Sequence, residues 1–200
     1  MAGFMTEVMR RMVTFNSSSA VLTSGATPVL EILSFCLGNA FHAFLVPTPY
    51  YPGFNRDTRW WIGVELIPVH HRSCDVGNLL SRDMLYDLLD FAREGNIHII
   101  SVEIFAGSMY GNEEFVSMAE ILESEDYERD RVHIIYGLSK DFSLPVFRVG
   151  GIYSFNENVL TASRKLSRFS SVPTPTQRLV VSVLLDKNLP GHTRRQIERE

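Results

Sequence analysis

The amino-acid sequence predicts an α/β fold with a mostly parallel sheet, and three observations lead to that class. Short apolar runs alternate with amphipathic stretches, which is typical of helices layered on a sheet. Two runs, 97–102 and 132–136, read as continuous apolar segments, as parallel strands do when both faces are covered. The chain has 200 residues, 45% hydrophobic and 21% charged, which suits one folded domain or part of a larger one.

The expected elements follow one another along the chain. Strands are expected at 43–46, 64–69, 97–102 and 132–136, and helices at 27–37, 81–93, 156–169 and 177–185, with a loop at 170–176. The helix at 27–37 follows Gly25-Ala26 and stops at Gly38. The helix at 81–93 begins with a good N-cap, Ser81, places leucines on one stripe and ends at Gly95.

Composition excludes several classes of function. A formal net charge of −4 gives no electrostatic reason to expect a nucleic-acid partner. No apolar run reaches the roughly 18–20 residues that a transmembrane helix needs, and the N-terminus does not resemble a secretory signal. The two cysteines, Cys36 and Cys74, form no disulfide framework and fit a reducing cytoplasmic compartment.

Lys140 is the first candidate for chemistry, because it follows the strand expected at 132–136. Ligands of open α/β sheets bind at the carboxyl ends of the strands. A lysine there can act as a Schiff-base lysine when burial or a neighbouring charge lowers its pKa. Arg148 lies eight residues on, and its guanidinium could hold a phosphate with two hydrogen bonds. Considered alone, a lysine in a Ser-Lys pair is more often a solvated surface lysine, and Arg148 is equally a surface ion-pair partner.

Two further segments could bind a ligand. Small residues at 23–27 lead into a helix whose N-terminal amides and dipole would attract an anion, although an ordinary N-cap at Thr27 fits the same residues. Prolines fix the loop at 47–54, where a tyrosine could stack on a flat heteroaromatic ring or pack as an aromatic corner. We expect no metal at His70, His71 and Cys74, because adjacent histidines of an extended chain point apart and no further ligand lies near.

Three segments together resemble one family. They read Val-Pro-Thr-Pro-Tyr-Tyr-Pro-Gly-Phe-Asn-Arg-Asp (46–57), Ser-Val-Glu-Ile-Phe-Ala-Gly-Ser (101–108), and Tyr-Gly-Leu-Ser-Lys-Asp (136–141) with Phe-Arg-Val-Gly (147–150). They resemble the plant 1-aminocyclopropane-1-carboxylate (ACC) synthases of the class I/II aminotransferases, which are fold-type I pyridoxal phosphate (PLP) enzymes. Phe-Ser-Ser-Val-Pro (169–173) is most similar to the divergent ACC-synthase-like branch, regarded as transaminases for aspartate and aromatic amino acids.

The resemblance implies a fold, a cofactor and partners. The fold would be the large domain of these enzymes, a three-layer αβα arrangement with a mostly parallel sheet, here incomplete. The cofactor would be PLP, and the substrates would be small molecules, namely amino acids and 2-oxo acids. Nucleic acid, membrane and metal are not expected. Family members form homodimers, which this shortened chain puts in doubt.

The resemblance also implies residue roles. Lys140 aligns with the lysine that binds PLP covalently and then moves the substrate Cα proton. Arg148 aligns with the phosphate-binding arginine, and the amides of Ala26 and Thr27 align with the phosphate-binding helix N-terminus. Ser139 is assigned to the same cofactor site.

The ring of PLP has an expected stacking partner, Tyr51, with Tyr50 as the less favoured neighbour. Where the family has an aspartate facing the pyridine nitrogen, this chain has Val102. Glu103 is adjacent, but on a strand it points to the other face. Phe105 and Gly137 also replace family hydroxyl residues, and both substitutions suit the divergent branch.

The length of the chain departs from the family as well. We expect a partial PLP-binding large domain at 1–185, with an internal deletion near 75–76 that removes a helix, a core strand and an asparagine loop. The tail at 186–200 would begin the small domain, and the family's N-terminal region would also be missing. Such a truncated copy, from a splice variant, a pseudogene or a faulty gene model, is expected to fold poorly alone, because a lost interior strand exposes unpaired backbone groups.

Three functions follow from these residues. The first is a PLP-dependent aminotransferase of the ACC-synthase-like type, impaired in this copy by Val102 and the missing segments. The second is ACC synthase itself, which converts S-adenosylmethionine to ACC in ethylene biosynthesis. The third is a non-catalytic fragment that pairs with a full-length paralogue.

Overall fold

The computed structural model describes residues 1–9, 12–70, 80–108, 115–124 and 127–185. Its α-helices are α1 (Ala2–Val8), α2 (Ala26–Leu37), α3 (Gly53–Ile62), α4 (Arg82–Glu94), α5 (Met118–Ser124), α6 (Leu138–Asp141), α7 (Glu157–Leu166) and α8 (Thr174–Leu185). Its strands are β1 (Ala20–Thr23), β2 (Ala43–Thr48), β3 (Glu65–His70), β4 (Ile99–Val102), β5 (Val132–Gly137) and β6 (Gly150–Ser154). Short 3₁₀ turns are η1 (Ser17–Ser19), η2 (Arg129–Arg131), η3 (Pro145–Phe147) and η4 (Ser167–Phe169).

The described strands form two sheets. The larger has the order β1-β6-β5-β4, and the smaller pairs β2 with β3. Strands β4 and β5 pair parallel, as do β2 and β3, whereas β6 runs antiparallel to both β1 and β5. Three of the four strands in the larger sheet therefore share one direction, and β6 is the exception to the expected parallel arrangement.

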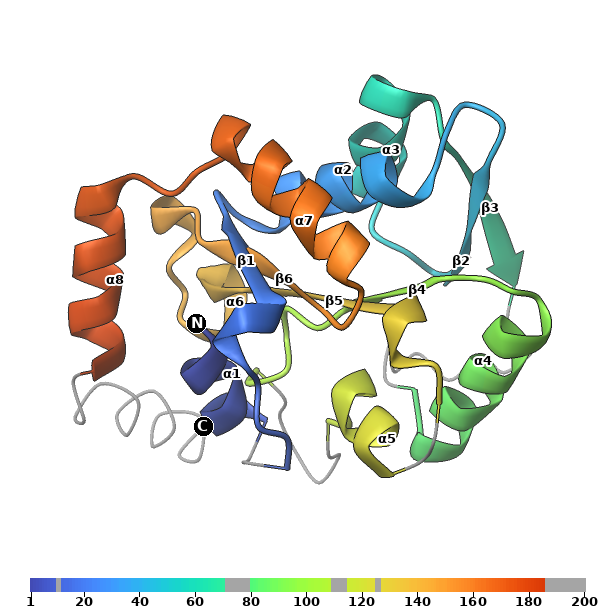
Figure 1. The fold of residues 1–200 in the computed structure, drawn as a ribbon, viewed down its shortest axis with the longest axis horizontal. Helices are drawn as coiled ribbons and strands as arrows, with labels where there is room; N and C mark the ends of the chain where they lie inside the picture. The colour runs from blue at the N-terminus through green and yellow to red at the C-terminus, as the bar shows by residue number, and fades with distance from the viewer. Residues whose placement is uncertain (10–11, 71–79, 109–114, 125–126, 186–200) are drawn as a thin grey trace.

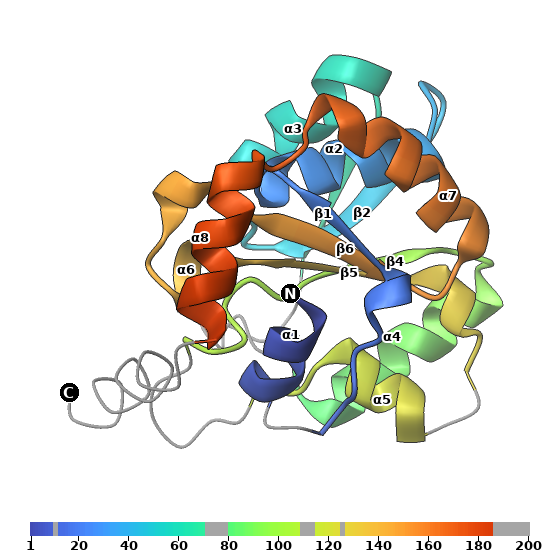
Figure 2. The ribbon, with the colours of Figure 1, turned by 60° about the vertical axis from the view of Figure 1, so that its left-hand side comes forward.

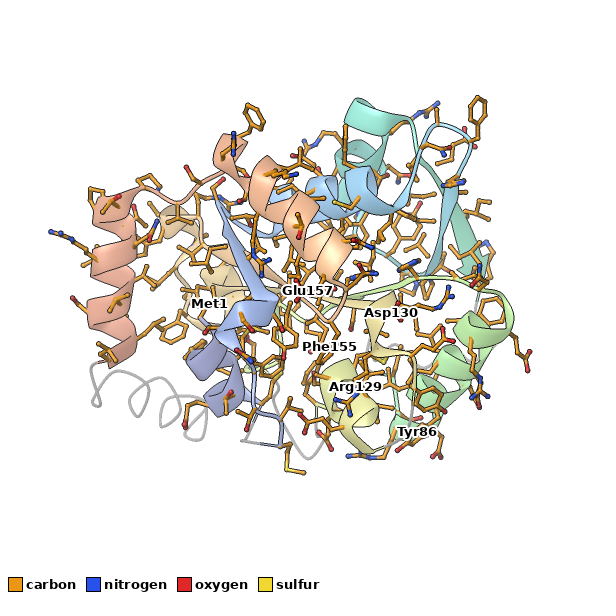
Figure 3. All side chains as sticks on the ribbon, in the orientation of Figure 1. Met1, Tyr86, Arg129, Asp130, Phe155 and Glu157 are labelled. Atoms are coloured by element: carbon orange, nitrogen blue, oxygen red, sulfur yellow. The ribbon has the colours of Figure 1, made fainter. Side chains whose placement is uncertain are left out.

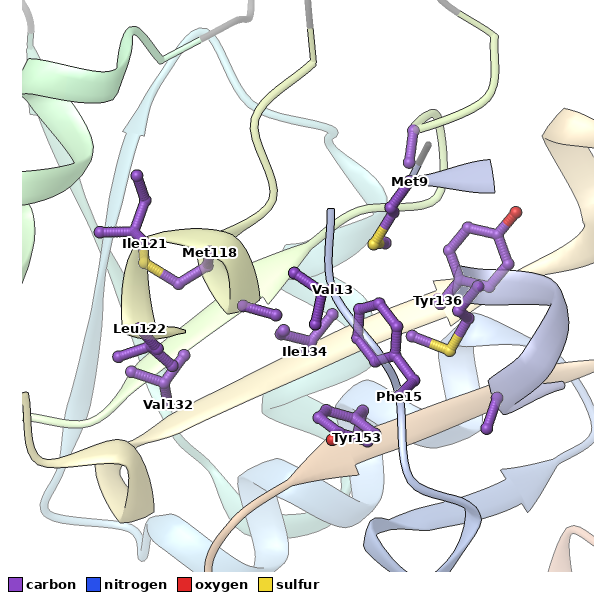
Figure 4. Packing of buried hydrophobic residues seen from close by; sticks show 14 of the residues in the cluster. Met9, Val13, Phe15, Met118, Ile121, Leu122, Val132, Ile134, Tyr136 and Tyr153 are labelled. Carbon is purple, nitrogen blue, oxygen red and sulfur yellow. The ribbon is translucent and has the colours of Figure 1, made fainter. Parts of the chain in front are cut away.

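Helices cover both faces of the larger sheet, so the expected α/β layering is confirmed. Figures 1 and 2 show α2, α3 and α7 on one face and α1, α4 and α5 on the other. Side chains of β5 and β6 alternate between these layers, as residues of a strand must. Ile134, Tyr136 and Tyr153 join the cluster under α1 and α5 (Figure 4), whereas Ile135 and Ile152 join the cluster under α2 and α7.

Most of the expected elements form close to their expected bounds. The continuous apolar runs become β4 and β5, and their parallel pairing places Ile99 opposite Val132. Helix α8 begins at Thr174 rather than at the expected Gln177. Its second residue, Pro175, is tolerated because the first turn of a helix has no intrahelical acceptor for that N–H group. Strands β1 and β6 and helices α1, α3, α5 and α6 were not expected.

The second sheet differs from the first in its covering. Every residue of β5 and β6 is buried, whereas β2 alternates between exposed and half-buried residues and β3 is almost wholly exposed. Leu45, Ile67 and Val69 are apolar residues that remain largely exposed on this sheet. The segment 71–79, which contains the expected deletion near 75–76, and the tail 186–200 lie outside the described residues.

The corner where β6 leads into α7 is fixed by contacts to η2. The guanidinium of Arg129 lies 5.7 Å from the centroid of the Phe155 ring (Figure 3), and Asn156 Nδ2 donates a hydrogen bond to the carbonyl oxygen of Asp130 at 3.1 Å. Asn156 also caps α7 by accepting from the amides of Asn158 and Val159. Within the described residues, no helix has the length and apolar character needed to span a membrane.

Candidate active site

Lys140 lies at the carboxyl end of β5, as expected. It belongs to α6, which follows β5 without a loop, and the Leu138 amide donates a hydrogen bond to the Val149 carbonyl oxygen at 3.0 Å. This bond fixes the lysine-bearing turn beside the segment that carries Arg148. The Lys140 side chain is exposed, and its Nζ atom lies 5.4 Å from the centroid of the Phe105 ring.

Arg148 reaches the N-terminus of α2, which is far from it in the sequence. The residue has a left-handed backbone conformation, with φ at 48°, directly after η3. Its guanidinium lies so close to Gly25 that a Cβ atom added there would be 2.5 Å from Nη2 of the arginine. Gly25 itself has φ at 102°, a conformation that L side chains rarely adopt. Glycine at position 25 therefore permits both the sharp turn and the approach of the arginine.

The start of β6 meets the same turn. A Cβ atom added to Gly150 would lie 2.5 Å from the carbonyl carbon of Gly25, so these two backbone segments are in direct contact. A Cβ atom on Gly137, at the end of β5, would lie 3.9 Å from Cβ of Ala26. The structure thus brings the α2 N-terminus, Arg148 and the end of β5 together at one edge of the sheet.

Ala26 and Thr27 are the first two residues of α2, and their amide groups have no acceptor within the helix. The third residue, Pro28, has no N–H group to add. The N-cap is Gly25 without a side-chain cap, so the alternative interpretation of Thr27 as the N-cap is wrong. Two amides that lack an acceptor within the helix, together with a guanidinium beside them, are suited to binding a phosphate or another anion.

Ser139 and Tyr51 are the other two expected site residues. Ser139 is half-buried in α6, next to Lys140. Tyr51 precedes α3 and is 63% exposed. Its ring lies edge-on to Phe54, with centroids 5.6 Å apart, and against Gly53. These contacts lie within one loop, so the roles of Tyr51 and Ser139 toward a cofactor stay predictions.

Val102 ends β4 with its side chain 38% exposed. Glu103 follows and points the other way, as expected. Its carboxylate is buried and accepts hydrogen bonds from Ser101 Oγ at 2.9 Å, Ser117 Oγ at 2.7 Å and the Met118 amide at 3.0 Å. Burial raises the pKa of Glu103 against the opposing effect of these bonds. Glu103 thus joins β4 to α5, and the neighbouring carboxylate does not replace Val102.

Sequence reasoning missed Asp141, the residue after Lys140. The Asp141 side chain is buried and accepts three hydrogen bonds, from Tyr136 Oη at 2.5 Å, Ser108 Oγ at 2.7 Å and the Gly107 amide at 3.0 Å. Burial is also the main cause that raises the pKa of Asp141. The only available signal was a carboxylate next to the candidate lysine, since the partners at 107 and 108 lie far from it in the sequence.

A second buried polar chain lies near the other end of β5. His133 is fully buried; its Nδ1 lies 2.8 Å from Ser154 Oγ and its Nε2 lies 2.9 Å from His98 Nδ1. Burial, together with the neighbouring His98, lowers the pKa of His133 to about 3. Among the described residues, no group of three or more His, Cys, Asp or Glu side chains could hold a metal ion. Of the residues considered for a metal, His71 and Cys74 lie outside the described residues.

Comparison with known proteins gives one family. The model of the family "Aminotransferase class I and II" matches residues 1–81 and 75–199. The chain is 51% identical over 219 residues to the "Probable aminotransferase ACS12" of Arabidopsis thaliana, covering 92% of this chain and 44% of that protein. It is 50% identical over 222 residues to the "1-aminocyclopropane-1-carboxylate synthase 6" of Oryza sativa subsp. japonica, covering 94% of this chain and 41% of that protein. The chain therefore spans less than half the length of these two relatives.

Solved structures share the fold. An aspartate aminotransferase from Thermotoga maritima matches with a TM-score of 0.79 at 19% identity, covering 98% of this chain and 57% of that chain. An aromatic aminotransferase from Pyrococcus horikoshii matches with a TM-score of 0.75 at 18% identity, covering 90% of this chain and 55% of that chain. The predicted fold is thus confirmed as that of fold-type I enzymes. Taken with the family model and the two plant relatives, it follows that this chain belongs to the class I and II aminotransferases, whose cofactor is PLP.

Proposed function

We propose that this chain is a PLP-dependent aminotransferase of the ACC-synthase-like type, with its own turnover impaired. The reaction would move an amino group from an amino acid, such as aspartate or an aromatic amino acid, to a 2-oxo acid. One observation carries the proposal: the Arg148 guanidinium lies against Gly25 at the open N-terminus of α2, beside the helix that bears Lys140. A cation, free amides and a lysine are the groups that a phosphorylated aldehyde requires.

The described residues fit one end of the cofactor better than the other. Arg148 with the amides of Ala26 and Thr27 would hold the phosphate, and Lys140 would bind the aldehyde carbon through Nζ. Ser139 would contact the phosphate end, and Tyr51 would cover the ring. At the pyridine nitrogen, Val102 offers no carboxylate, and Glu103 is committed to Ser101 and α5.

Each residue has a distinct task in the proposed reaction. When bound, PLP supplies the electron-withdrawing ring that accepts charge from the substrate Cα. After the substrate amine displaces Nζ from the aldehyde carbon, Lys140 would take the Cα proton onto the freed Nζ and deliver it to that carbon. Arg148 would hold the cofactor in place by binding its negatively charged phosphate group. Because Val102 cannot keep the pyridine nitrogen protonated, we expect a loss comparable to an electrostatic contact of about 3–4 kcal/mol in the transition state.

We also propose that this chain lacks a segment between β3 and α4 that its relatives carry. The family model matches the chain in two pieces, residues 1–81 and 75–199, which overlap at 75–81. The alignment to the Arabidopsis relative runs over 219 residues, more than the 200 of this chain, so the relative has additional residues inside the matched region. A sheet divided between β4 and β2 supports the same interpretation. The division into a partial domain at 1–185 and a tail at 186–200 remains part of this proposal.

Two other functions keep a specific observation in their favour. ACC synthase, which acts on S-adenosylmethionine, is the activity for which the rice relative is named. A non-catalytic fragment that pairs with a full-length paralogue is favoured by the exposed apolar residues of β2 and β3. A homodimer of the family type and a cytoplasmic location belong to the same set of proposals, the latter because Cys36 is a free cysteine.

The test is covalent capture of PLP. The chain has three lysines, Lys140, Lys165 and Lys187, so the purified protein is incubated with PLP, reduced with borohydride and analysed by peptide mass spectrometry. We expect the pyridoxyl group at Lys140, and its loss in Lys140→Ala. Lys165→Ala is the matched control, because Lys165 is an exposed lysine on α7. Label spread evenly over the three lysines would contradict the proposal. A specific adduct would justify transaminase assays on aspartate, tyrosine and phenylalanine.

A further inference from the structure

Asp141 is a buried carboxylate that no step of the proposed function uses. Its side chain is 7% exposed, and all of its hydrogen-bond partners are donors: a phenol, a hydroxyl and a backbone amide. Such a set satisfies an ionised carboxylate, which needs several donors when it is removed from water. The donors come from two separate segments of the chain, 107–108 and Tyr136.

Two of the donors belong to the turn that follows β4. Gly107 and Ser108 end a turn in which the Ala106 amide donates to the Glu103 carbonyl oxygen at 3.2 Å and the Ser108 amide donates to that of Phe105 at 2.9 Å. Glu103 anchors the start of the turn, since its amide donates to the Ile135 carbonyl oxygen at 2.8 Å. Asp141 anchors the end.

The contact between Asp141 and this turn is close. A Cβ atom added to Gly107 would lie 3.1 Å from Cγ and from Oδ2 of Asp141, so the carboxylate packs directly on the glycine backbone. The third donor, Tyr136 Oη, comes from β5, immediately before α6. The carboxylate therefore joins the turn after β4, the end of β5 and the helix that carries Lys140.

Between the two anchors, the turn presents Phe105 to Lys140. The phenylalanine is 51% exposed, and its ring is the group over which the lysine ammonium lies at 5.4 Å from the centroid. Among the described residues, Lys140 forms no ion pair. The direction of the Lys140 side chain thus depends on where the Phe105 ring is held.

We propose that Asp141 is a positioning residue, which sets the direction of the Lys140 side chain by fixing the 104–108 turn and with it the Phe105 ring. The inference deepens the proposed function, on which its relevance to catalysis rests. The geometric claim itself concerns only this chain's own side chains. It predicts that loss of Asp141 frees Lys140 from the ring without touching the lysine directly.

The experiment measures the reactivity of Lys140 in the absence of PLP. Trace acetylation of the whole chain with acetic anhydride, followed by peptide mass spectrometry, gives the ratio of label at Lys140 to label at Lys165. Loss of the cation–π contact, about 0.5–1 kcal/mol at an exposed site, corresponds to a roughly two- to fivefold rise in this ratio. We expect that rise in Asp141→Ala and in Phe105→Leu, and no further rise when the two are combined. Asp87→Asn, at an exposed position of α4, is the matched control and leaves the ratio unchanged.

Rescue by a similar side chain separates geometry from charge. An asparagine at position 141 can still accept from the Gly107 amide and pair with Ser108, so Asp141→Asn should keep a ratio close to that of the unsubstituted chain. Ser108→Ala removes a single donor and keeps the other bonds to Asp141, so we expect a smaller rise in the ratio of label at Lys140 to label at Lys165. This variant preserves the test if Asp141→Ala fails to fold.

Two results would overturn the proposal. An unchanged ratio in folded Asp141→Ala or in Ser108→Ala, with a raised ratio in Phe105→Leu, would show that the turn holds its place without the carboxylate. A ratio in Asp141→Asn as high as in Asp141→Ala would assign the effect to the negative charge instead of the ring. If PLP capture fails while the acetylation ratios follow the expected pattern, the result would count against the proposed function and not against the positioning role of Asp141.

Discussion

The two sheets of this molecule both contain apolar strand residues, but one sheet is buried and the other is largely exposed. Strands β5 and β6 are buried along their whole length between α1 and α5 on one face and α2 and α7 on the other. Strands β2 and β3 pair in parallel over six residues, but Leu45, Ile67 and Val69 stay exposed. Helices cover both faces of β5 and β6, whereas apolar side chains of β2 and β3 remain exposed.

This contrast separates the candidate site into two parts. Lys140, Arg148 and the α2 N-terminus belong to the covered sheet, where each is fixed by backbone contacts. Tyr51 follows the exposed sheet, and Val102 ends the strand at the edge between the two sheets. We therefore expect anchoring of a cofactor to be retained better than the chemistry of its ring, and the following variants test that difference.

The largest effect is expected from the core of the covered sheet. Ile134 is 1% exposed, so Ile134→Ala should lower the free energy of unfolding by about 2–5 kcal/mol through lost burial and a cavity. Ile67 is 48% exposed on β3, and Ile67→Ala should change it by only about 0.5 kcal/mol. Urea denaturation followed by circular dichroism measures both. Equal losses would show that β2 and β3 are covered in solution.

Arg148 provides the next comparison. Arg148→Ala should weaken PLP binding by about 1.5–3 kcal/mol, or roughly tenfold to a hundredfold, because a charged hydrogen-bond donor to the phosphate is lost. Arg56→Ala removes an exposed arginine from α3 and should leave the affinity unchanged. Titration monitored by absorbance gives both dissociation constants. A similar loss in the two variants would place the phosphate elsewhere.

Acid sensitivity should also come from the covered sheet. The pKa of His133 is lowered from 6.5 to about 3 by burial, so the unfolded chain takes up the proton first as the pH falls. Stability from this group is complete above pH 6.5 and is lost below it, at about 1.4 kcal/mol per pH unit. Between pH 7 and pH 5, the free energy of unfolding should depend less steeply on pH in His133→Asn than in the unsubstituted chain. A pH slope as steep in His133→Asn as in the unsubstituted chain would refute this explanation.

The smallest effect is expected at the edge between the sheets. Val102→Asp restores a carboxylate at a position that is 38% exposed, where water screens it, so we expect less than a tenfold gain in transamination rate. Single-turnover kinetics with aspartate as the amino donor measures the gain. A gain of a hundredfold would mean that the ring end of the site is intact and that Val102 alone limits turnover.

The sequence predicts the covered sheet only in part. Strands β4 and β5 were predictable because their apolar runs are unbroken. Strand β6 was not, because it opens with Gly150-Gly151, and glycine is unfavourable within strands. The structure supplies the reason for these glycines, since a Cβ atom at Gly150 would lie 2.5 Å from Gly25 and one at Gly151 would lie 3.1 Å from the Val21 carbonyl oxygen. Close approach of backbones cannot be seen in a pattern of hydrophobicity.

The candidate site, like the covered sheet, could be predicted from the sequence only in part. Lys140 and Arg148 could be proposed from their position after a strand, and the amides of Ala26 and Thr27 from the small residues before a helix. Asp141 could not, because its role depends on Gly107 and Ser108, which come close only when β4 pairs with β5. Helix α3 was hidden by the prolines of its preceding loop, and its end is marked only by the left-handed Gly63.

The antiparallel pairing of β5 with β6 has a consequence for the order of folding. Because β6 returns beside β5, Lys140 and Arg148 sit on one short connection that the bond from the Leu138 amide to the Val149 carbonyl oxygen closes. Closing a connection of this length costs little chain entropy, whereas the pairing of β1 with β6 must bring together residues more than a hundred positions apart. The lysine and the arginine are therefore expected to find each other early, as a nucleus on which the N-terminal strand and the anion-binding helix assemble later.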